Sequence, residues 1–412
     1  MSRALDHPVT VTADDVAAAR PAAESVARRT PQLSSRTISE RAGGVVSLKA
    51  ENLQRTGSFK VRGVGAKLAA LGEAGCRSGV VAASAGNHAQ ALAAGARALG
   101  VRCEVFVPSD APLAKVEAAR GQGAIIHVGG ASVDECLAAA RERAQEGGLA
   151  FVHPFDDPHV VAGQGSLGLE LLEDVPDLAK VVVPVGGGGL CAGVAIAVKA
   201  ARPEVEVVGV QVAACAPYPE SLRRGEPVPA GSALTIADGI AVKRPGALTL
   251  GLLSRWADDV VVVGEDETAE AMVVLMERCK LVVEGAGAVG VAALLGGQVA
   301  PAATGTTVAV LSGGNVDPGL LASIARRHET EAGRRAILLT RVADRPGNLA
   351  RLLDCVAAQG ANIVDVAHVR EGLDLHVRET AVELVIETRG HDHASIVVAA
   401  LEDAGYATRV LR

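Results

Sequence analysis

The sequence predicts an α/β protein with two open, mostly parallel α/β subdomains around one cleft, followed by a ferredoxin-like module. Three observations support this fold class. Short apolar strands alternate twice with helices of about 10–15 residues, which is typical of βαβ units and a parallel sheet. Glycine-rich turns follow several of these strands, where such sheets bind ligands. Residues 336–412 instead follow the order βαββαβ.

The composition limits the function classes that the chain can belong to. Its 412 residues exceed one ordinary core, so we expect two or three domains. Hydrophobic residues make up 49% of the chain and aromatic residues only 2%, so we expect an aliphatic core and no surface that stacks bases. The net charge of −7 also argues against binding to a phosphate backbone. We therefore expect no nucleic-acid partner.

Cysteines and apolar segments indicate the compartment. The seven cysteines form no C-x-x-C pair, which favours reduced thiols over disulfides or a zinc site. The first residues lack the apolar region of a signal peptide. The uncharged run 181–198 is long enough to span a membrane, but Pro184 and Gly186–Gly189 interrupt it, so we interpret it as strand, loop and helix. We expect a cytoplasmic protein with no membrane partner.

The first α/β set begins with a helix whose start is signalled by Thr12 and two aspartates. Val45–Lys49 is a short strand that leads into a polar stretch, and a weak helical period follows from Val61 to Leu71. Strands and helices then alternate at Val80–Ala83, Ala89–Leu99, Val101–Val107, Ala114–Gln122, Ala124–Val128 and Ser132–Gln145.

The second set and the tail follow the same reasoning. The second set has strands Val181–Val185, Val205–Gln211, Val260–Val263 and Thr307–Leu311, with the helix Glu267–Cys279 and the small-residue stretch Gly285–Leu295 before the last. The hydrophilic segment Glu329–Arg335 is interpreted as a linker. The tail has strands Ala336–Val342, Asn362–His368, Ala381–Thr388 and Ala407–Leu411, and helices Asn348–Gln359 and Asp392–Ala404.

The stretch Glu51–Gly63, ENLQRTGSFKVRG, carries the most informative residue. Lys60 lies between Phe59 and Val61, and removal of water from a lysine lowers its pKa, as an amine that attacks a carbonyl requires. The hydroxyls and N–H groups of Thr56–Ser58 precede a helix start, where an anion is stabilised. The alternative interpretation is a surface lysine at an N-cap.

Three further turns carry polar groups at strand ends. Gly186–Gly189 let the backbone approach an anion closely, so a phosphate cradle is favoured over a helix–sheet contact alone. In the turn Ser84–Gln90, Asn87 can donate to a phenolate-type oxygen, and the N–H groups around Ser84–His88 can hold a carboxylate. Ser312 offers a hydroxyl to a ring nitrogen. With Lys60, these groups describe a site for pyridoxal 5'-phosphate.

These motifs also carry a family resemblance. ENLQRTGSFKVRG, ASAGNHAQ, PVGGGGL, TIADGI, VEGAGA and SGGN, in this order over about Thr12–His328, resemble the threonine dehydratases (threonine ammonia-lyases), pyridoxal-phosphate enzymes built like the tryptophan synthase β-subunit. The tail resembles an ACT domain at Asp344–Leu349. The resemblance implies a catalytic domain at 1–328, with a smaller subdomain at about 50–155 inserted between 1–49 and 156–328, a linker at 329–335 and an ACT regulatory domain at 336–412.

The resemblance also implies roles for individual residues. Lys60 binds the cofactor covalently and later removes the α-proton of the amino-acid substrate, L-threonine or more weakly L-serine. Cofactor contacts are implied for Phe59, Lys60, Asn87, Gly186, Gly187, Gly188, Gly189, Leu190 and Ser312. Ser84, with Ala85, Gly86, Asn87 and His88, is implied to hold the substrate carboxylate. Glu284 is either a helix-start acid or part of the cleft wall.

Two departures separate the chain from the related serine racemases. Racemases resemble this region but carry a second serine as the opposite-face base, where this chain has Ala85, so dehydration is favoured over racemisation. They also use carboxylates for a divalent metal where this chain has Gln211 and Pro217, so no such metal site is expected. A serine/threonine racemase, an L-serine dehydratase and a sensor without catalysis are the alternatives.

The ACT resemblance implies regulation and assembly. We expect isoleucine or valine to bind near Asp344, Pro346, Gly347, Asn348, Leu349 and Asn362. Paired ACT domains also imply a homodimer or homotetramer. The alternative is a tail that only dimerises the protein.

Overall fold

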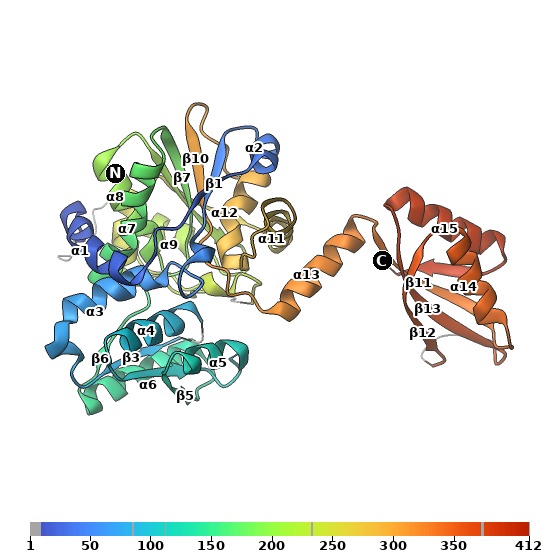
Figure 1. Ribbon diagram of the computed structural model, residues 1–412, viewed down its shortest axis with the longest axis horizontal. Coiled ribbons are helices and arrows are strands. Elements are labelled where there is room, and N and C mark those ends of the chain that lie inside the picture. Colours follow the sequence, from blue (N-terminus) through green and yellow to red (C-terminus); the bar gives the residue numbers. More distant parts are fainter. Residues whose placement is uncertain (1–9, 85, 112, 232–233, 372–374, 412) are drawn as a thin grey trace. The chain divides into compact units, whose positions relative to one another are not determined.

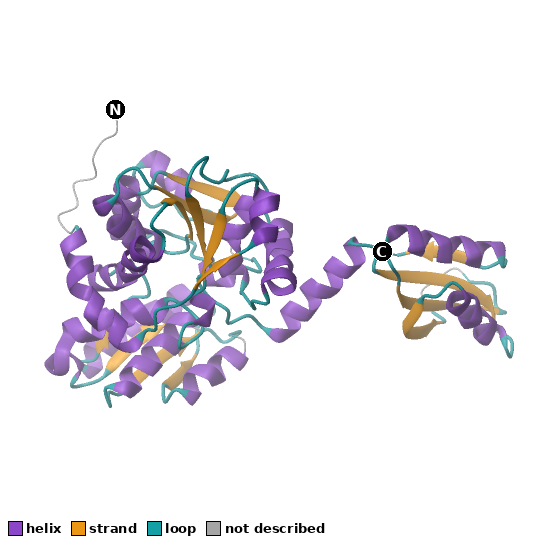
Figure 2. Ribbon diagram, turned by 45° about the horizontal axis from the view of Figure 1, so that its top comes forward, coloured by secondary structure: helices purple, strands orange, loops and turns teal. Residues whose placement is uncertain are grey.

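The computed structural model describes residues 10–84, 86–111, 113–231, 234–371 and 375–411. The chain divides into two compact units, Met1–Asp317 and Pro318–Arg412, and each is described here by itself. Figure 1 labels their elements, and Figure 2 distinguishes helices from strands. Among the described residues, no helix combines the length and apolar character needed to cross a membrane.

The first unit contains a large sheet with the order β1-β2-β10-β7-β8-β9. Its strands are β1 (Gln32–Ser34), β2 (Val46–Lys49), β7 (Leu178–Pro184), β8 (Glu206–Val212), β9 (Asp259–Val263) and β10 (Thr306–Val310). All neighbours pair in parallel except β1 and β2. Valine-rich strands buried on both faces suit such a sheet, and helices cover both of its faces (Figure 1).

A smaller parallel sheet in the same unit has the order β5-β4-β3-β6. Its strands are β3 (Val80–Ala83), β4 (Cys103–Val107), β5 (Ile125–Val128) and β6 (Ala150–Phe151). All four lie in the chain between β2 and β7 of the large sheet, and Figure 2 shows the two groups of strands apart from one another. The two open, mostly parallel sheets that the sequence predicts are therefore present.

Several helices of the first unit begin at capping residues that the sequence contains. Thr12 forms a capping box with Asp15, and Ser132 and Asp157 cap two further helices. The helices are α1 (Ala13–Val26), α2 (Arg36–Ala42), α3 (Lys60–Cys76), α4 (Asn87–Ala98), α5 (Leu113–Gly121), α6 (Val133–Gly147), α7 (Pro158–Asp174), α8 (Gly189–Ala201), α9 (Tyr218–Arg224), α10 (Ala247–Trp256), α11 (Glu265–Cys279) and α12 (Gly285–Leu295), with 3-10 turns η1 (Glu51–Leu53) and η2 (Asp238–Ile240).

Three of these elements bear directly on the sequence analysis. The run 181–198 forms the end of β7, a loop and most of α8, as interpreted. The helical period that ends at Leu71 stops where α3 kinks, because Gly72 has a φ of 62°. Helix α7 has no counterpart among the predicted elements. Most of its residues from Val160 to Leu171 are buried, so it lacks the polar face that signals a helix.

The second unit forms one antiparallel sheet with the order β12-β13-β11-β14 and two helices packed on one face. After α13 (Pro318–Glu331), its elements are β11 (Arg335–Ala343), α14 (Asn348–Ala358), β12 (Asn362–Val369), β13 (Glu379–Glu387), α15 (His391–Asp403) and β14 (Ala407–Val410). The order βαββαβ is the predicted one. The first compact unit ends at Asp317, and α13 runs across the expected boundary at 328 to Glu331, inside the segment 329–335 expected to be a linker.

Candidate active site

One pocket in the first unit gathers the residues at the centre of the sequence analysis. Phe59, Lys60, Asn87, Gly186–Leu190 and Ser312 all line it, around about 480 Å³ of space that is partly open to solvent. They come from the start of α3, the start of α4, the loop between β7 and α8, and the turn after β10. Glu284, one of whose two expected places was the cleft wall, lines it as well. Sequence reasoning assigned no role to the remaining lining residues, which are Pro154, Phe155, Gln164, Pro184, Gly239, Ile240 and Ala286.

Lys60 is the first residue of α3 and its amine lies inside the pocket. Nζ donates a hydrogen bond to the Pro154 carbonyl oxygen at 2.9 Å and lies 5.1 Å from the centre of the Phe59 ring. Burial lowers the pKa of Lys60 to about 8, against a weaker opposing effect of the Glu284 carboxylate. The amine therefore has a larger neutral, nucleophilic fraction near neutral pH than an exposed lysine.

The loop Gly186–Gly189 has the shape and the donors of an anion cradle. A Cβ added to Gly187 would lie 2.1 Å from the Phe155 ring, and a Cβ added to Gly188 would lie 2.1 Å from the Tyr218 hydroxyl oxygen. Glycine is therefore required at both positions. In the described part of the chain, the backbone N–H groups of 186–190 have no protein acceptor. They lie at the N-terminus of α8, where the helix dipole favours an anion.

Tyr218 supports this loop from behind, and sequence reasoning missed it. Its buried hydroxyl lies 2.9 Å from the Gly187 carbonyl oxygen and 3.0 Å from Thr249 Oγ1. Gln211 accepts a hydrogen bond from the Tyr218 N–H at 2.8 Å and donates to the Val185 carbonyl oxygen at 3.1 Å. The two side chains thus hold the chain at Val185 and Gly187, and an amide at position 211 supplies both the donor and the acceptor that this arrangement needs.

A chain of amides and one carboxylate forms another wall of the pocket. Asn87 Nδ2 donates to Glu284 Oε1 at 2.7 Å, and Asn87 Oδ1 accepts from Asn315 Nδ2 at 2.7 Å. Burial, with a smaller contribution from Asp238, raises the pKa of Glu284 to about 7. Glu284 precedes α12 and also lines the pocket, so both of its predicted roles apply.

The turn before α4 is described except for Ala85, so the prediction for that residue lies outside the described residues. Ser84 Oγ accepts a hydrogen bond from the Gly86 N–H at 3.2 Å. The His88 ring is buried, its Nε2 lies 3.0 Å from the Val152 carbonyl oxygen, and burial lowers its pKa to about 3. Since this ring is held by the backbone and does not line the pocket, only the N–H group of His88 is suited to a carboxylate.

These groups fit pyridoxal phosphate. The cradle at 186–190 offers unpaired N–H donors to a phosphate group, and Lys60 offers an amine to an aldehyde. Asn87 and the buried Ser312 hydroxyl line the same pocket, where they can reach ring substituents.

The residues predicted to bind an effector lie in the second unit, which the structure describes separately. Asp344 pairs with Arg370 at 2.6 Å, and Asn348 donates to the Ala343 carbonyl oxygen at 2.8 Å, so both belong to one compact turn. Asn362 pairs with Glu387 at the other end of the sheet, since the ladder from Ala343 to Arg335 runs between them. One copy of the module therefore does not bring Asn362 to this turn.

Comparisons with known proteins show the family and the fold. The family model described as pyridoxal-phosphate dependent enzyme matches residues 24–313. An L-threonine ammonia-lyase of Thermotoga maritima is 44% identical over 402 residues, which cover 97% of this chain and 100% of that protein. A catabolic L-threonine dehydratase of Escherichia coli K12 is 41% identical over 314 residues, covering 76% of this chain and 95% of that protein.

Solved structures give the same picture. The processed form of threonine deaminase isoform 2 from Solanum lycopersicum has a TM-score of 0.71 and 31% identity, covering 78% of this chain and 95% of that one. A serine racemase of maize has a TM-score of 0.73 and 32% identity, covering 78% of this chain and 99% of that one. The fold is therefore shared by proteins named for two different reactions on small amino acids.

Proposed function

This chain belongs to the family of pyridoxal-phosphate dependent enzymes, and from that premise we propose that it is an L-threonine ammonia-lyase. It converts L-threonine to 2-oxobutanoate and ammonia, and L-serine more slowly to pyruvate. The observation that carries the proposal is the buried Lys60 amine in one pocket with the N–H groups of Gly186–Leu190, which have no protein acceptor among the described residues. The full-length relative from Thermotoga maritima, named for this activity, supports the choice of reaction.

The residues that would hold the cofactor are those that line the pocket. Gly186–Leu190 would hold its phosphate, Asn87 and Ser312 its ring, and Lys60 its aldehyde carbon. When bound, pyridoxal phosphate supplies an electron sink for the negative charge that develops at the α-carbon of an amino acid.

The chain's own groups bind the substrate and move its protons. The N–H groups of Asn87 and His88, in the first turn of α4, and the Ser84 hydroxyl would hold the substrate carboxylate, whereas the Ser84 N–H already donates to the Phe106 carbonyl oxygen. Lys60 Nζ accepts the α-proton, because its pKa of about 8 lies close to the working pH of a general base. Glu284 holds Asn87 in place through the 2.7 Å hydrogen bond.

The residue at position 85 bears on whether the protein is a racemase. Solved neighbours include serine racemases, so the fold does not separate the two reactions. Position 85 is an alanine, which has no hydroxyl to deliver a proton to the opposite face of the substrate. This supports elimination over racemisation.

An assay of products tests the proposal against its alternatives. The purified protein with pyridoxal phosphate should form 2-oxobutanoate from L-threonine faster than pyruvate from L-serine at equal concentration. Formation of D-serine or D-threonine without oxo acid would establish a racemase, and pyruvate as the main product would establish an L-serine dehydratase. A protein that binds the cofactor but makes none of these products would contradict the proposal.

Replacement of one glycine tests the cradle separately. Gly187→Ala should weaken cofactor binding by at least about tenfold, because the new methyl group would overlap the Phe155 ring. Gly251→Ala is a matched control on the same unit, because no atom lies within 4 Å of its added Cβ and its backbone is not left-handed. Equal cofactor affinity in both variants would contradict the assignment of the loop.

We further propose that the second unit is an ACT module that binds isoleucine or valine and pairs with a second copy in a cytoplasmic homodimer or homotetramer. Its βαββαβ order and the left-handed Gly347 in the turn before α14 support this assignment. A site that combines this turn with Asn362 requires two copies, since the two lie at opposite ends of one sheet. Equilibrium dialysis should detect either amino acid on the wild type and not on Asn348→Ala. Absence of binding would leave a purely dimerising tail.

A further inference from the structure

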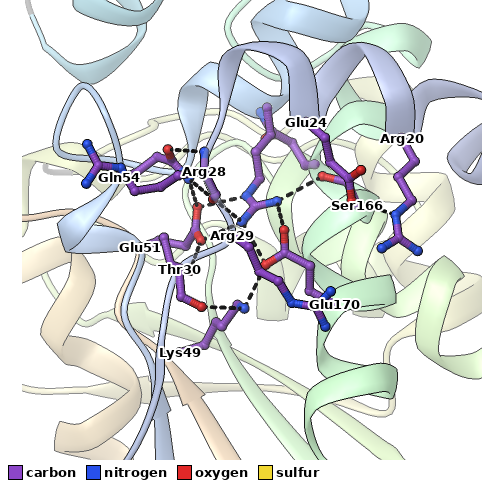
Figure 3. Close-up of polar contacts among 12 residues, drawn as sticks. Arg20, Glu24, Arg28, Arg29, Thr30, Lys49, Glu51, Gln54, Ser166 and Glu170 are labelled. Carbon is purple, nitrogen blue, oxygen red and sulfur yellow. Dashed lines mark hydrogen bonds and ion pairs between the residues drawn. The ribbon is translucent and has the colours of Figure 1, made fainter.

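A cluster of buried ion pairs lies next to the pocket, and the proposed reaction does not use it. Lys49, Glu51, Arg62 and Glu170 form this cluster, which we call the Arg62 cluster. Figure 3 labels three of its members, Lys49, Glu51 and Glu170. All four residues are at most 1% exposed. They come from the end of β2, the start of η1, the first turn of α3 and the last turns of α7.

Arg62 is the centre of the cluster. Its guanidinium donates two hydrogen bonds of 2.8 Å to Glu51 and bonds of 2.7 and 3.0 Å to Glu170. Ser166 of α7 accepts a further bond at 3.2 Å. Lys49 forms a 2.7 Å ion pair with Glu170, so the cluster contains two basic and two acidic side chains. Such two-pronged pairs fix the direction of a guanidinium as well as its position.

The cluster holds the turn of α3 that carries Lys60. Residues two apart on a helix point about 200° apart, so Arg62 anchors the side of the turn opposite Lys60. The N-cap residue Phe59 makes no side-chain capping bond and the first turn has no acid, so the usual stabilisers of a helix start are missing. The Arg62 side chain supplies the fixed contacts there.

The same helix pair also fixes the hydrogen-bond partner of Lys60. Helices α3 and α7 approach closely, since an added Cβ on Gly163 would lie 2.7 Å from the Arg62 carbonyl oxygen. The Gly63 N–H donates to Gln164 of α7 at 3.1 Å. The chain that leads into α7 contains Pro154, whose carbonyl oxygen accepts the bond from Lys60. A shift of α3 relative to α7 would therefore change the distance between the Lys60 amine and the Pro154 carbonyl oxygen.

We propose that the Arg62 cluster positions the Lys60 amine, by locking the first turn of α3 to α7 and η1. Arg62 is a positioning residue, which acts through Lys60 and does not touch the reacting atoms. Stability alone does not account for four buried charges, because well-packed apolar side chains often stabilise a fold as well as a buried ion pair does. The proposal rests on the proposed function only in treating Lys60 as the catalytic amine.

The pKa of the Lys60 amine reports on its position, since burial is the main cause of its low value. The titratable groups that influence this amine electrostatically are Glu284 before α12, His88 on α4 and His153 after β6. The variants proposed below leave all three unchanged. A changed pKa in these variants would therefore reflect a displaced amine.

The test measures Lys60 in the cofactor-free full-length protein. An amine-directed acylating reagent is applied across a pH series, and modification of the Lys60 peptide is followed by mass spectrometry. Arg62→Lys keeps the charge but loses the two-pronged geometry. Glu104→Gln is the matched control, because Glu104 is also a fully buried carboxylate with ion pairs to Arg102 and Arg143, but it belongs to β4 and does not line the pocket.

In Arg62→Lys the Lys60 pKa should rise from about 8 toward 10.5, and kcat of the loaded enzyme should fall on the order of 10²-fold with a smaller change in KM. Glu104→Gln should lower the melting temperature but leave the Lys60 pKa and kcat as in wild type. A folded Arg62→Lys with an unchanged Lys60 pKa overturns the proposal, even if the reaction proves to be another one.

If Arg62→Lys does not fold, Ser166→Ala decides the question. This variant removes a single neutral contact of Arg62 and keeps every charge of the cluster. The proposal requires the pKa of Lys60 to be measurably higher in Ser166→Ala than in Glu104→Gln. Equal values in the two variants overturn it.

Discussion

Two groups of buried charge lie on opposite sides of the first turn of α3, and they differ in how completely they are paired. In the Arg62 cluster, every charged side chain contacts an opposite charge. Burial alone would raise the pKa of Glu51, but the charge and hydrogen bonds of Arg62 outweigh it and hold this pKa below its usual value. In the pocket, Lys60 contacts a neutral carbonyl and Glu284 contacts an amide.

The difference shows how one short helix start serves both stability and reactivity. Within the cluster, the Glu51–Arg62 pair keeps its charges, because pairing lowers the pKa of Glu51 and raises that of Arg62. In the pocket, burial shifts Lys60 and Glu284 toward their neutral forms, which gives Lys60 a pKa of about 8 and Glu284 a pKa of about 7. The pocket can therefore exchange protons in a range where the Glu51–Arg62 pair cannot.

The largest effect is expected from breaking the cluster. Arg62→Met removes the positive charge that Glu51 contacts and leaves a buried carboxylate without its partner. The free energy of unfolding should fall by about 3–5 kcal/mol. Chemical denaturation of the full-length protein measures this change. A decrease of less than about 1 kcal/mol in the free energy of unfolding would mean that the charges of the cluster are not fully paired in solution. The cluster and the pocket would then not differ in how their charges are paired.

A smaller effect of opposite sign is expected in the pocket. Burial raises the pKa of Glu284 from 4.5 to about 7, so ionisation of this residue costs stability in the folded state. The wild type should lose stability relative to Glu284→Gln as the pH rises from 4.5 to 7, by at most about 3 kcal/mol, and the difference should stay constant at higher pH. Melting temperatures of the two proteins across this range provide the measurement. A difference independent of pH would show that Glu284 does not have a raised pKa.

The smallest effect is expected for a pair on the surface. Arg36 and Glu40 form an ion pair of 2.8 Å one turn apart on α2, with side chains 89% and 64% exposed. Glu40→Gln should change the free energy of unfolding by about 0.3–0.5 kcal/mol, and the effect should disappear at high salt. Denaturation at low and high salt tests this. A loss comparable with that of Arg62→Met would show that burial is not what distinguishes the cluster.

The sequence predicted the parts of the pocket that are coded by adjacent residues. Lys60 between two apolar neighbours, the four glycines after β7 and Asn87 at the start of α4 each form a local pattern, and together they point to one cofactor although each alone leaves an alternative open. The repeated alternation of strands and helices likewise predicted both parallel sheets and the βαββαβ tail.

The other parts depend on contacts between residues far apart in the chain. Tyr218 supports the glycine loop from 31 positions away, and Glu170 reaches Arg62 across 108 positions, so neither has a signal in its own neighbourhood. Helix α7 was missed because it is buried on most sides and shows no polar face. The charged end of α13 resembles a linker in composition, so its helical continuation to Glu331 was not predicted.

The most direct test of the account is an absorbance spectrum of the protein loaded with pyridoxal phosphate, compared with that of Lys60→Ala, before and after addition of L-threonine. The wild type should show the visible band of a lysine-bound cofactor and form 2-oxobutanoate. Lys60→Ala should lack both, while its melting temperature shows that the fold is intact. A wild-type protein that gains no visible band with added cofactor, or a Lys60→Ala variant that keeps the band and the activity, would contradict the account.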